Sequence, residues 1–454
     1  MIELKEYKLG DLLDVTRGAS LSGEYYTTEG NHVRLTLGHF DYVNGGFKEN
    51  KSKDNLFFNG PIRDEFILKK GDIITPLTEQ TFGLIGSTAM IPESGKYIQS
   101  QDIGLVKCNE DLLAPEFCYY LLPTPMVKNQ LSAGAQQTSI RHTSPDKIKA
   151  CKVFIPALPE QKKIASLLAS IDKKIVINRE INQNLEAMAK QLYDYWFVQF
   201  DFPNEEGKPY KSSGGAMVWS EKLKREIPEG WFASNVCKIA DILSGGTPSK
   251  VISEYWDDGS IPFFGPTDCN GNVFQIETAD HITPEGLEHC ASSLFEEGII
   301  IITARGSIGK LVVVGTPMAM NQSCYALRSK TGEYEYLYFL TIQLIECLKA
   351  KGSGSVFKSI ITSDIENSLL CIAPTDIIKR FCKSVHPLFQ KIKENTIEIS
   401  NLTKQRDELL PLLMNGQVSL NSDLEVHKSL QFLFAIVEIN AILLIFESFL
   451  YYLT

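Results

Sequence analysis

Two stretches in the first half of this 454-residue chain recur in its second half. Residues 9–18 (LGDLLDVTRG) are similar to residues 236–245 (VCKIADILSG), and residues 70–74 (KGDII) map onto residues 297–301 (EGIII) at the same offset of 227. A repeat of about 220 residues is far longer than the roughly 20–50 residues of a solenoid unit. The sequence therefore predicts two similar domains in one polypeptide, each able to bury its own core.

A long amphipathic helix is predicted after each domain. Apolar residues alternate in steps of three and four from Ile164 to Trp196 and again from Phe381 to Leu413, which is coiled-coil spacing. If the helices pair antiparallel with their centres together, Asn182 faces Asn395, and a buried polar pair of this kind fixes register. Two helices that pack separately on their own domains are the alternative.

The predicted fold class is α+β, with two similar mixed domains joined by two long antiparallel coiled-coil helices in a pseudo-two-fold arrangement. Lys69–Asp72, between two short apolar pairs, also predicts a hairpin in the first domain. The predicted boundaries are 1–156 for the first domain, 157–202 for the central helix, 203–230 for a polar linker, 231–374 for the second domain, 375–420 for the distal helix and 421–454 for an atypical tail.

The tail contains a mostly apolar stretch of 25 residues from Leu430 to Thr454. Its length would suffice to cross a bilayer, but Glu438 and Glu447 make a membrane position costly. We expect a non-native extension or a packed amphipathic helix, and no membrane association. The chain opens MIELKE, without an apolar signal segment, which predicts a cytoplasmic protein.

The formal net charge of -10 argues against a uniformly basic nucleic-acid binder. The charge is uneven, however. Residues 298–332 contain Arg305, Lys310, Arg328 and Lys330 and no acid, and residues 126–152 contain five bases and one acid. Such windows fit a phosphate backbone, and ordinary solvated faces are the alternative.

We found no complete catalytic motif. The ten cysteines form no Cys-x-x-Cys pair, and the seven histidines lack metal-ligand spacing. Asp146, Glu160 and Lys162 are residue types of a magnesium-dependent nuclease, but the last two begin a helix, where positions i and i+2 face differently. We expect no cofactor and no metal, and a nuclease remains the weaker alternative.

Loops in both halves carry small polar and basic side chains of the kind that hold phosphates and read bases. The candidates in the first domain are Arg17, Gln136, Gln137, Ser139 and Arg141. Those in the second domain are Ser244, Thr247, Arg305, Lys310, Lys358 and Ser359.

Several longer motifs carry a family resemblance. They are residues 155–164 (IPALPEQKKI), 195–202 (YWFVQFDF), 227–231 (IPEGW), 244–249 (SGGTPS), 406–411 (RDELLP) and 415–417 (NGQ). With these motifs the chain resembles, over residues 1 to about 420, the DNA-specificity subunit of a type I restriction–modification enzyme.

The resemblance implies a non-catalytic subunit with two target-recognition domains at opposite ends of an antiparallel coiled coil. Each domain would read half of a bipartite, asymmetric site in double-stranded DNA. The helices would bind two methyltransferase subunits, and a motor-nuclease subunit would join for cleavage. A coiled-coil assembly scaffold without DNA specificity is the runner-up.

The chain departs from this pattern in two places. Residues 71–105 contain four acids and one lysine and lack counterparts of Arg305 and Lys310, so Thr78, Gln80 and Thr81 are the candidates there. The second helix opens with residues 373–377 (APTDI) and lacks the Pro-x-x-Glu-Gln pattern of the first.

Overall fold

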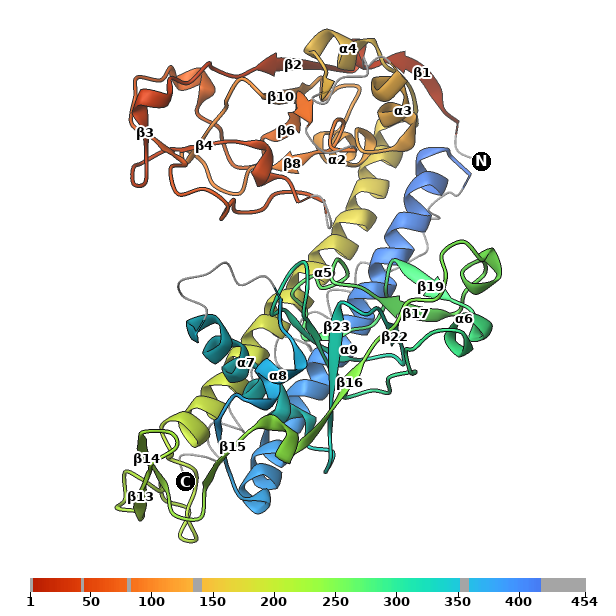
Figure 1. Ribbon diagram of the computed structural model, residues 1–454. Helices are drawn as coiled ribbons and strands as arrows, with labels where there is room; N and C mark the ends of the chain where they lie inside the picture. The colour runs from red at the N-terminus through yellow and green to blue at the C-terminus, as the bar shows by residue number, and fades with distance from the viewer. Residues whose placement is uncertain (1–2, 42–44, 80–82, 134–140, 352–358, 418–454) are drawn as a thin grey trace. The chain divides into compact units, whose positions relative to one another are not determined.

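The computed structural model describes residues 3–41, 45–79, 83–133, 141–351 and 359–417 (Figure 1). Contacts divide the chain into two units. Unit 1 comprises Met1–Lys173 and Thr403–Thr454, and unit 2 comprises Lys174–Leu402. Each unit contains one repeat together with part of both long helices, α5 (Leu158–Tyr193) and α9 (Thr375–Met414).

Unit 1 is built around a four-stranded antiparallel sheet. Its strands, in spatial order, are β2 (Leu13–Arg17), β10 (Ile103–Cys108), β6 (Ile73–Pro76) and β8 (Ala89–Met90). A second sheet contains β3 (Tyr26–Thr27), β5 (Phe57–Phe58), β4 (Val33–Arg34) and β9 (Tyr97–Ile98). Two further pairs are β1 (Lys5–Lys8) with β12 (Lys152–Ile155) and β7 (Thr78–Glu79) with β11 (Arg141–His142). The short helices are α1 (Leu9–Leu12), α2 (Pro115–Leu121), α3 (Pro125–Ala133) and α4 (Pro145–Ala150).

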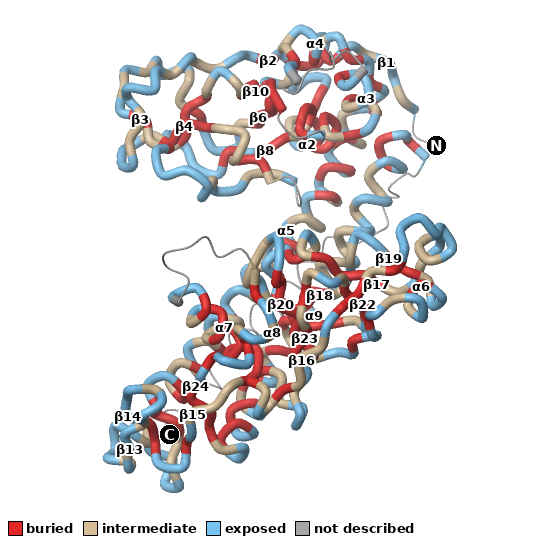
Figure 2. Tube along the Cα trace, viewed as in Figure 1, coloured by how far each residue is buried: buried red, intermediate tan, exposed pale blue. Residues whose placement is uncertain are grey.

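Unit 2 is built around a five-stranded sheet. Its strands, in spatial order, are β16 (Ala240–Ser244), β23 (Cys324–Ser329), β20 (Ile300–Thr303), β21 (Leu311–Val314) and β18 (Phe274–Gln275). A smaller sheet contains β19 (Asp280–Ile282), β17 (Ile261–Phe264) and β22 (Ala319–Met320). Two further pairs are β13 (Met217–Ser220) with β14 (Arg225–Pro228) and β15 (Phe232–Ser234) with β24 (Leu370–Ile372). The shorter helices are α6 (Pro284–Glu288), α7 (Tyr334–Lys351) and α8 (Thr362–Glu366). β20 and β21 form a buried layer (Figure 2).

The two units repeat each other down to strand register. Lys5 pairs with Ile155 in unit 1, and Phe232 pairs with Ile372 in unit 2. Leu13 opposite Cys108 likewise recurs as Ala240 opposite Ser329. Register depends on which face of a strand is apolar, so a preserved register reflects a preserved hydrophobic pattern. The predicted fold class, two similar mixed domains with long helices, is confirmed.

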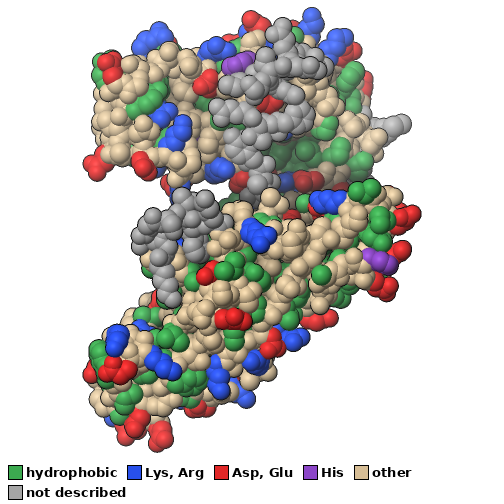
Figure 3. Space-filling model, viewed as in Figure 1, with side chains coloured by type: hydrophobic (Ala, Val, Ile, Leu, Met, Phe, Trp, Pro, Cys, Tyr) green, Lys and Arg blue, Asp and Glu red, His purple; other side chains and the backbone are tan. Residues whose placement is uncertain are grey.

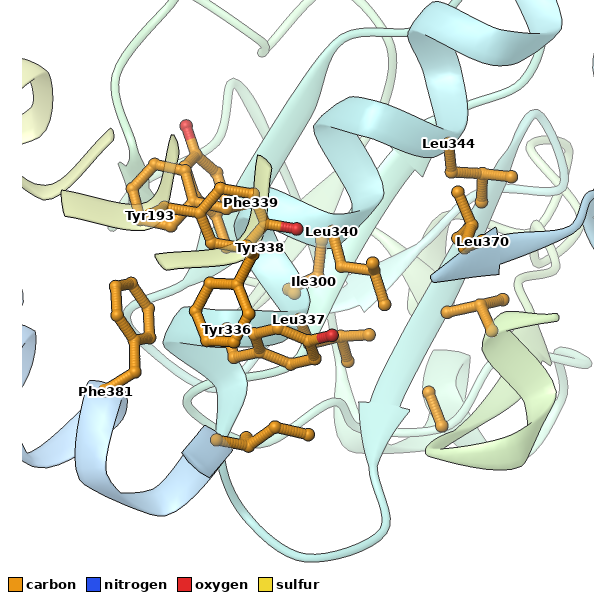
Figure 4. Close-up of a cluster of buried hydrophobic side chains, with 14 of the residues drawn as sticks. Tyr193, Ile300, Tyr336, Leu337, Tyr338, Phe339, Leu340, Leu344, Leu370 and Phe381 are labelled. Carbon is orange, nitrogen blue, oxygen red and sulfur yellow. The ribbon is translucent and has the colours of Figure 1, made fainter. Parts of the chain in front are cut away.

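Aromatic side chains dominate the core of unit 2 (Figure 4). Tyr193, at the end of α5, lies 5.2 Å from Phe339 of α7 between ring centroids, and Phe197 lies 5.0 Å from Phe381 of α9. Residues Asp194–Val198 form a π-helical turn directly after α5, which brings Trp196 and Phe197 into this core. Residues of the YWFVQFDF motif therefore pack between the end of α5 and the first part of α9 within unit 2.

The two long helices pair antiparallel within each unit. In unit 1, Ile164 and Leu168 of α5 share a core cluster with Leu413 of α9. In unit 2, the Asn395 side-chain amide donates to Asn182 Oδ1 at 2.9 Å, so the predicted asparagine pair is confirmed. Asn182 also donates to Thr396 Oγ1 at 3.2 Å, so both the oxygen and the nitrogen of its side-chain amide have hydrogen-bond partners. α9 ends at Met414, and Gly416, two residues later, has a φ of 64°, the left-handed conformation in which glycine commonly ends a helix.

The hairpin predicted around Lys69–Asp72 is wrong. A turn does form there, with the Asp72 amide donating to Lys69 O at 3.0 Å. However, Ile67 forms a bridge to Ile98, whereas Ile73 and Ile74 pair with β10 and β8. Local turn chemistry marked the reversal correctly, but the strand partners come from distant sequence.

Two segments, residues 203–230 and the C-terminal tail, lie outside the repeats. Within residues 203–230 the structure has the β13–β14 hairpin, and Phe202 stacks on Tyr210 at 4.6 Å between ring centroids. In the described part of the chain, no helix is both long and apolar enough to cross a membrane. The apolar stretch that begins at Leu430 lies outside the described residues.

Candidate nucleic-acid interface

Three loops of unit 2 meet at one edge of its five-stranded sheet. β16 ends at Ser244 and β20 ends at Thr303, and these residues pair with Tyr325 and Cys324 at the start of β23. The loops after Ser244 and Thr303 therefore flank the turn of residues 321–323, which connects β22 to β23. The candidates Ser244, Thr247, Arg305 and Lys310 all lie in this small region.

The Gly245-Gly246 pair lets the first loop cross the junction between the end of β22 and the 321–323 turn. A Cβ on Gly245 would lie 2.4 Å from the carbonyl oxygens of both Met320 and Asn321, so a larger residue would clash with backbone. The Gly246 amide donates to Met320 O at 3.0 Å. Beyond the crossing, the Thr247 hydroxyl donates to Gln322 Oε1, which ties the first loop to the turn through side chains.

The second loop, residues 304–310, is closed by Thr303. The fully buried Thr303 hydroxyl donates to Ser307 O and accepts from the Lys310 amide at 3.0 Å. Lys310 is exposed, and its ammonium donates to Cys269 O at 3.1 Å. Arg305 is also exposed, and its guanidinium has no ion-pair partner in the part of the chain that the structure describes. Arg305 thus presents an available cation at the edge.

The segment before β24 reaches the same edge. The Ile360 amide donates to Ala304 O at 2.9 Å, which places the half-buried Ser359 beside the 304–310 loop. Five of the six candidates of the second domain are therefore brought together. The sixth, Lys358, lies outside the described residues.

Three of the backbone hydrogen bonds at this edge have counterparts in unit 1. Its Ala19 amide donates to Gln99 O at 3.0 Å, as Gly246 does to Met320. The Leu77 amide donates to Asp102 O at 2.8 Å, and the Ala304 amide donates to Ser323 O at the same distance. The bond from the Thr143 amide to Leu77 O, 2.9 Å, corresponds to that from Ile360 to Ala304. The repeat therefore preserves the edge as well as the sheet.

The side chains at the unit 1 edge are different. Arg17 is exposed at the end of β2, but Thr78 is only 9% exposed. Arg141 pairs through its backbone with Glu79, and its side chain is outside the description. The remaining candidates, Gln80, Thr81, Gln136, Gln137 and Ser139, lie outside the described residues.

Glu79 closes the loop of unit 1. This carboxylate is 4% exposed and accepts hydrogen bonds from the amides of Gly83, Leu84 and Ile85 at 3.1, 2.9 and 2.9 Å. Three converging N–H groups compensate a buried carboxylate, so the acid that seemed unfavourable for phosphate binding has a structural role. Burial lowers the pKa of nearby Lys128, which donates to Gly83 O at 3.0 Å in the same loop.

Sequence reasoning missed the central turn of each edge. Asn321 accepts from the Ser323 amide at 2.9 Å through Oδ1, and Gln322 is exposed beside Thr247. The exposed Gln101 occupies the corresponding turn of unit 1. These turns precede strands paired in identical register, so extending the repeat alignment through β10 and β23 would have found them.

The residues of the nuclease alternative do not form one site. Asp146 pairs with Lys149 at 3.5 Å, whereas Glu160 pairs with Lys163 at 2.7 Å on α5. Among the described residues, no group of three or more His, Cys, Asp or Glu side chains could hold a metal ion. On the face drawn in Figure 3, basic and acidic side chains are interspersed.

Comparison with known proteins identifies the family. Residues 1–187 and 228–403 match the family described as "Type I restriction modification DNA specificity domain". A type I restriction enzyme specificity subunit of Methanocaldococcus jannaschii is 30% identical over 68% of this chain and 70% of its own length. The HindI specificity subunit of Haemophilus influenzae is 24% identical over 92% of this chain and its entire length.

A solved structure supports the fold. The S subunit of a type I restriction–modification system from M. genitalium is 18% identical, covers 91% of this chain and 96% of its own, and superposes with a TM-score of 0.55. The chain therefore belongs to the family of type I restriction–modification DNA-specificity subunits.

Proposed function

We propose that the chain reads a bipartite, asymmetric site in double-stranded DNA, with the loop edge of each unit reading one half. The observation that carries this proposal is the edge built twice from the same backbone hydrogen bonds with different side chains. A shared scaffold lets both units approach DNA in the same way, and different side chains let them read different bases. As a specificity subunit, the chain is non-catalytic.

Each side chain at the edge suits a distinct task. An exposed arginine such as Arg305 can bind guanine O6 and N7 through two donors, and an exposed amide such as Gln322 can bind adenine. The close backbone approach at Gly245 and the Lys310 ammonium suit phosphate oxygens. In unit 1, Arg17 and Gln101 are the exposed counterparts.

Specificity subunits of type I complexes assemble with modification and restriction subunits. We propose two methyltransferase subunits, because the pattern of paired helix and domain occurs twice, and one shared motor-nuclease subunit. The recognition domains would be residues 1–156 and 231–374, the helical scaffold 157–202 and 375–420, and 203–230 their connection. We place the complex in the cytoplasm with the DNA that it reads and assign the tail after residue 420 no role.

Mapping methylated adenines in cells that express the assembled complex tests this proposal. Arg305→Ala and Lys310→Ala should weaken or relax the second half-site and leave the first half-site sequence unchanged. A lost base contact should cost about 1–3 kcal/mol of discrimination. Arg17→Ala should have the reciprocal effect on the first half-site.

Lys224→Ala provides the control, because this exposed lysine of the β13–β14 turn is paired with Glu221 and lies outside the edge. Its methylated motif should equal that of the wild type. The proposal fails if Arg305→Ala and Arg17→Ala also leave both half-sites intact at normal affinity. An assembled complex that methylates no defined sequence would instead favour a scaffold without DNA specificity.

A further inference from the structure

The loop after Thr247 ends in an exposed tip formed by Ser249, Lys250, Val251 and Ile252. Val251 is 94% exposed, the highest value among the exposed large hydrophobic residues of the described chain. Burial of a valine side chain is favourable, and this position forgoes that stabilisation in the free chain. An apolar side chain that stays exposed at a loop tip is available to contact a binding partner.

The tip is braced from behind by one tryptophan. Trp256 follows the 3₁₀ turn η6 (Ser253–Tyr255), and its indole N–H donates to Ser249 O at 3.0 Å. The Lys250 ammonium lies 5.4 Å from the centroid of the same ring. Valine is stiff at χ1, so a braced backbone presents its two methyl groups in a defined direction. Val251 is therefore exposed on a loop tip whose backbone is fixed by these two contacts of Trp256.

The tip continues the candidate DNA edge. Thr247 is bonded to Gln322 at that edge, and Val251 follows Thr247 by four residues. Four residues span at most about 14 Å at roughly 3.6 Å each. A half-site of a few base pairs has a similar length, at roughly 3.4 Å per step, so Val251 can contact the half-site that the edge would read.

Unit 1 has a bond of a similar kind at other positions. Its Tyr26 hydroxyl donates to Leu21 O at 3.0 Å, whereas at the offset of 227 these two residues correspond to Ser253 and Pro248. Ser20, Ser22 and Glu24 are exposed around Leu21, and Tyr25 is 38% exposed. The exposed aromatic side chain of this loop is thus far less exposed than Val251.

We infer that Val251 is a specificity-determining residue that contacts the 5-methyl group of a thymine in the second half-site. This inference rests on the proposed function. Thymine is the base that offers an apolar group in the major groove, and apolar side chains recognise it there.

Binding of the assembled complex to duplexes that carry its mapped site tests the inference. Thymines of the second half-site are replaced one at a time by deoxyuracil, which keeps base pairing and removes only the methyl group. A mapped second half-site that contains no thymine would overturn the inference at once. One replacement should weaken wild-type binding about fourfold, the value of one buried methyl group. Val251→Ala should weaken binding to the normal duplex by at least that factor and show no further loss with deoxyuracil.

Val218→Ala is the matched control, because Val218 is 41% exposed on β13 of the same unit. This variant should bind the normal duplex like the wild type and keep the deoxyuracil effect. Unchanged wild-type binding at every replaced thymine, or an undiminished deoxyuracil effect in Val251→Ala, overturns the inference while leaving site-specific binding intact. Failure of the proposed function is distinct, because no defined site would then be bound.

Discussion

The loop edges of the two units carry equivalent backbone hydrogen bonds, yet each loop is closed by a different side chain. In unit 1 the Glu79 carboxylate accepts from three consecutive amides. In unit 2 the Thr303 hydroxyl closes a shorter loop through one accepted and one donated bond, and no acid is used. The backbone framework of the edge can therefore stay constant while loop length and charge change, which suits a pair of domains that must read different sequences.

The starts of the two long helices differ in the same way. Gln161 is 1% exposed; it accepts from the Ala114 amide and donates to Leu112 O and Pro156 O, all at 2.9 Å. The position 217 residues later is Ile378, which is buried in the core of unit 2. Unit 1 thus attaches its helix through directional polar bonds, whereas unit 2 uses apolar packing and the aromatic cluster.

Gln161→Ala should produce the largest difference between the units. Removing the side-chain amide leaves two buried backbone groups, the Ala114 N–H and the Pro156 carbonyl, without this partner. Each costs about 1–3 kcal/mol, so unit 1 should lose at least about 2 kcal/mol. Ile378→Val should cost unit 2 only about 0.5–1.5 kcal/mol. Hydrogen exchange measured by peptide separates the units, and tryptophan fluorescence reports unit 2 alone because all four tryptophans lie there. Equal losses in the two variants would remove the distinction between polar and apolar attachment.

Acid should weaken unit 1 through His39. Burial lowers the pKa of His39 from 6.5 to about 4, and the Thr36 amide donates to its Nδ1 at 3.1 Å. Above pH 6.5 the imidazole is neutral in both states and its contribution is intact. As the pH falls from 6.5 towards 4, the unfolded chain takes up a proton that the folded chain resists, so stability is lost.

The expected loss from His39 is about 2 kcal/mol between pH 7 and pH 5, at roughly 1.4 kcal/mol per pH unit below 6.5. Urea unfolding of the wild type and of His39→Gln at both pH values measures it, since the variant should lack this part of the pH dependence. His289→Gln, at an exposed histidine of unit 2, should behave like the wild type. A parallel pH response of His39→Gln and the wild type would contradict the assignment.

Substitution of the two side chains that close the loops, Glu79 and Thr303, should give the smallest effect, which is confined to local opening of each loop. Glu79→Ala should make the amides of Gly83, Leu84 and Ile85 exchange about tenfold faster, because bonds to a charged acceptor contribute about 1.5 kcal/mol or more. Thr303→Val, which keeps the shape and loses the hydroxyl, should accelerate exchange of the Lys310 amide about two- to fivefold, since neutral bonds contribute about 0.5–1 kcal/mol. If Thr303→Val accelerates amide exchange in its loop more than Glu79→Ala does in the other loop, the charge of the acceptor does not explain the difference between the two loops.

Much of the fold was predictable because it depends on periodicity and repetition. The apolar seams that begin at Ile164 and Phe381 lie 217 residues apart, and the observed starts of α5 and α9 at Leu158 and Thr375 are separated by the same number. Antiparallel pairing with the helix centres together predicted the Asn182–Asn395 contact. The same pattern reading gave the wrong partners to Ile67 and Ile73, because a turn signal reports where a chain reverses and carries no information about which strand it then joins.

The candidate site was predictable only in part. Composition singled out Arg305 and Lys310 but could not show that the Glu79 carboxylate accepts hydrogen bonds from backbone amides, nor that Thr78 is buried. Gln322 escaped notice because a glutamine in a turn has no signature of its own. It gains meaning from Thr247, whose hydroxyl is bonded to it across 75 residues of sequence.

The sequence by itself determined the repeat, the helix lengths and the pairing position of the helices, because these follow from the order and spacing of apolar residues. Only the tertiary structure decided which loops share an edge and which charges are compensated there. It also decided which apolar side chain is held out in water at Val251. Those properties arise where strands from distant parts of the chain end side by side, and no local pattern in the sequence records that proximity.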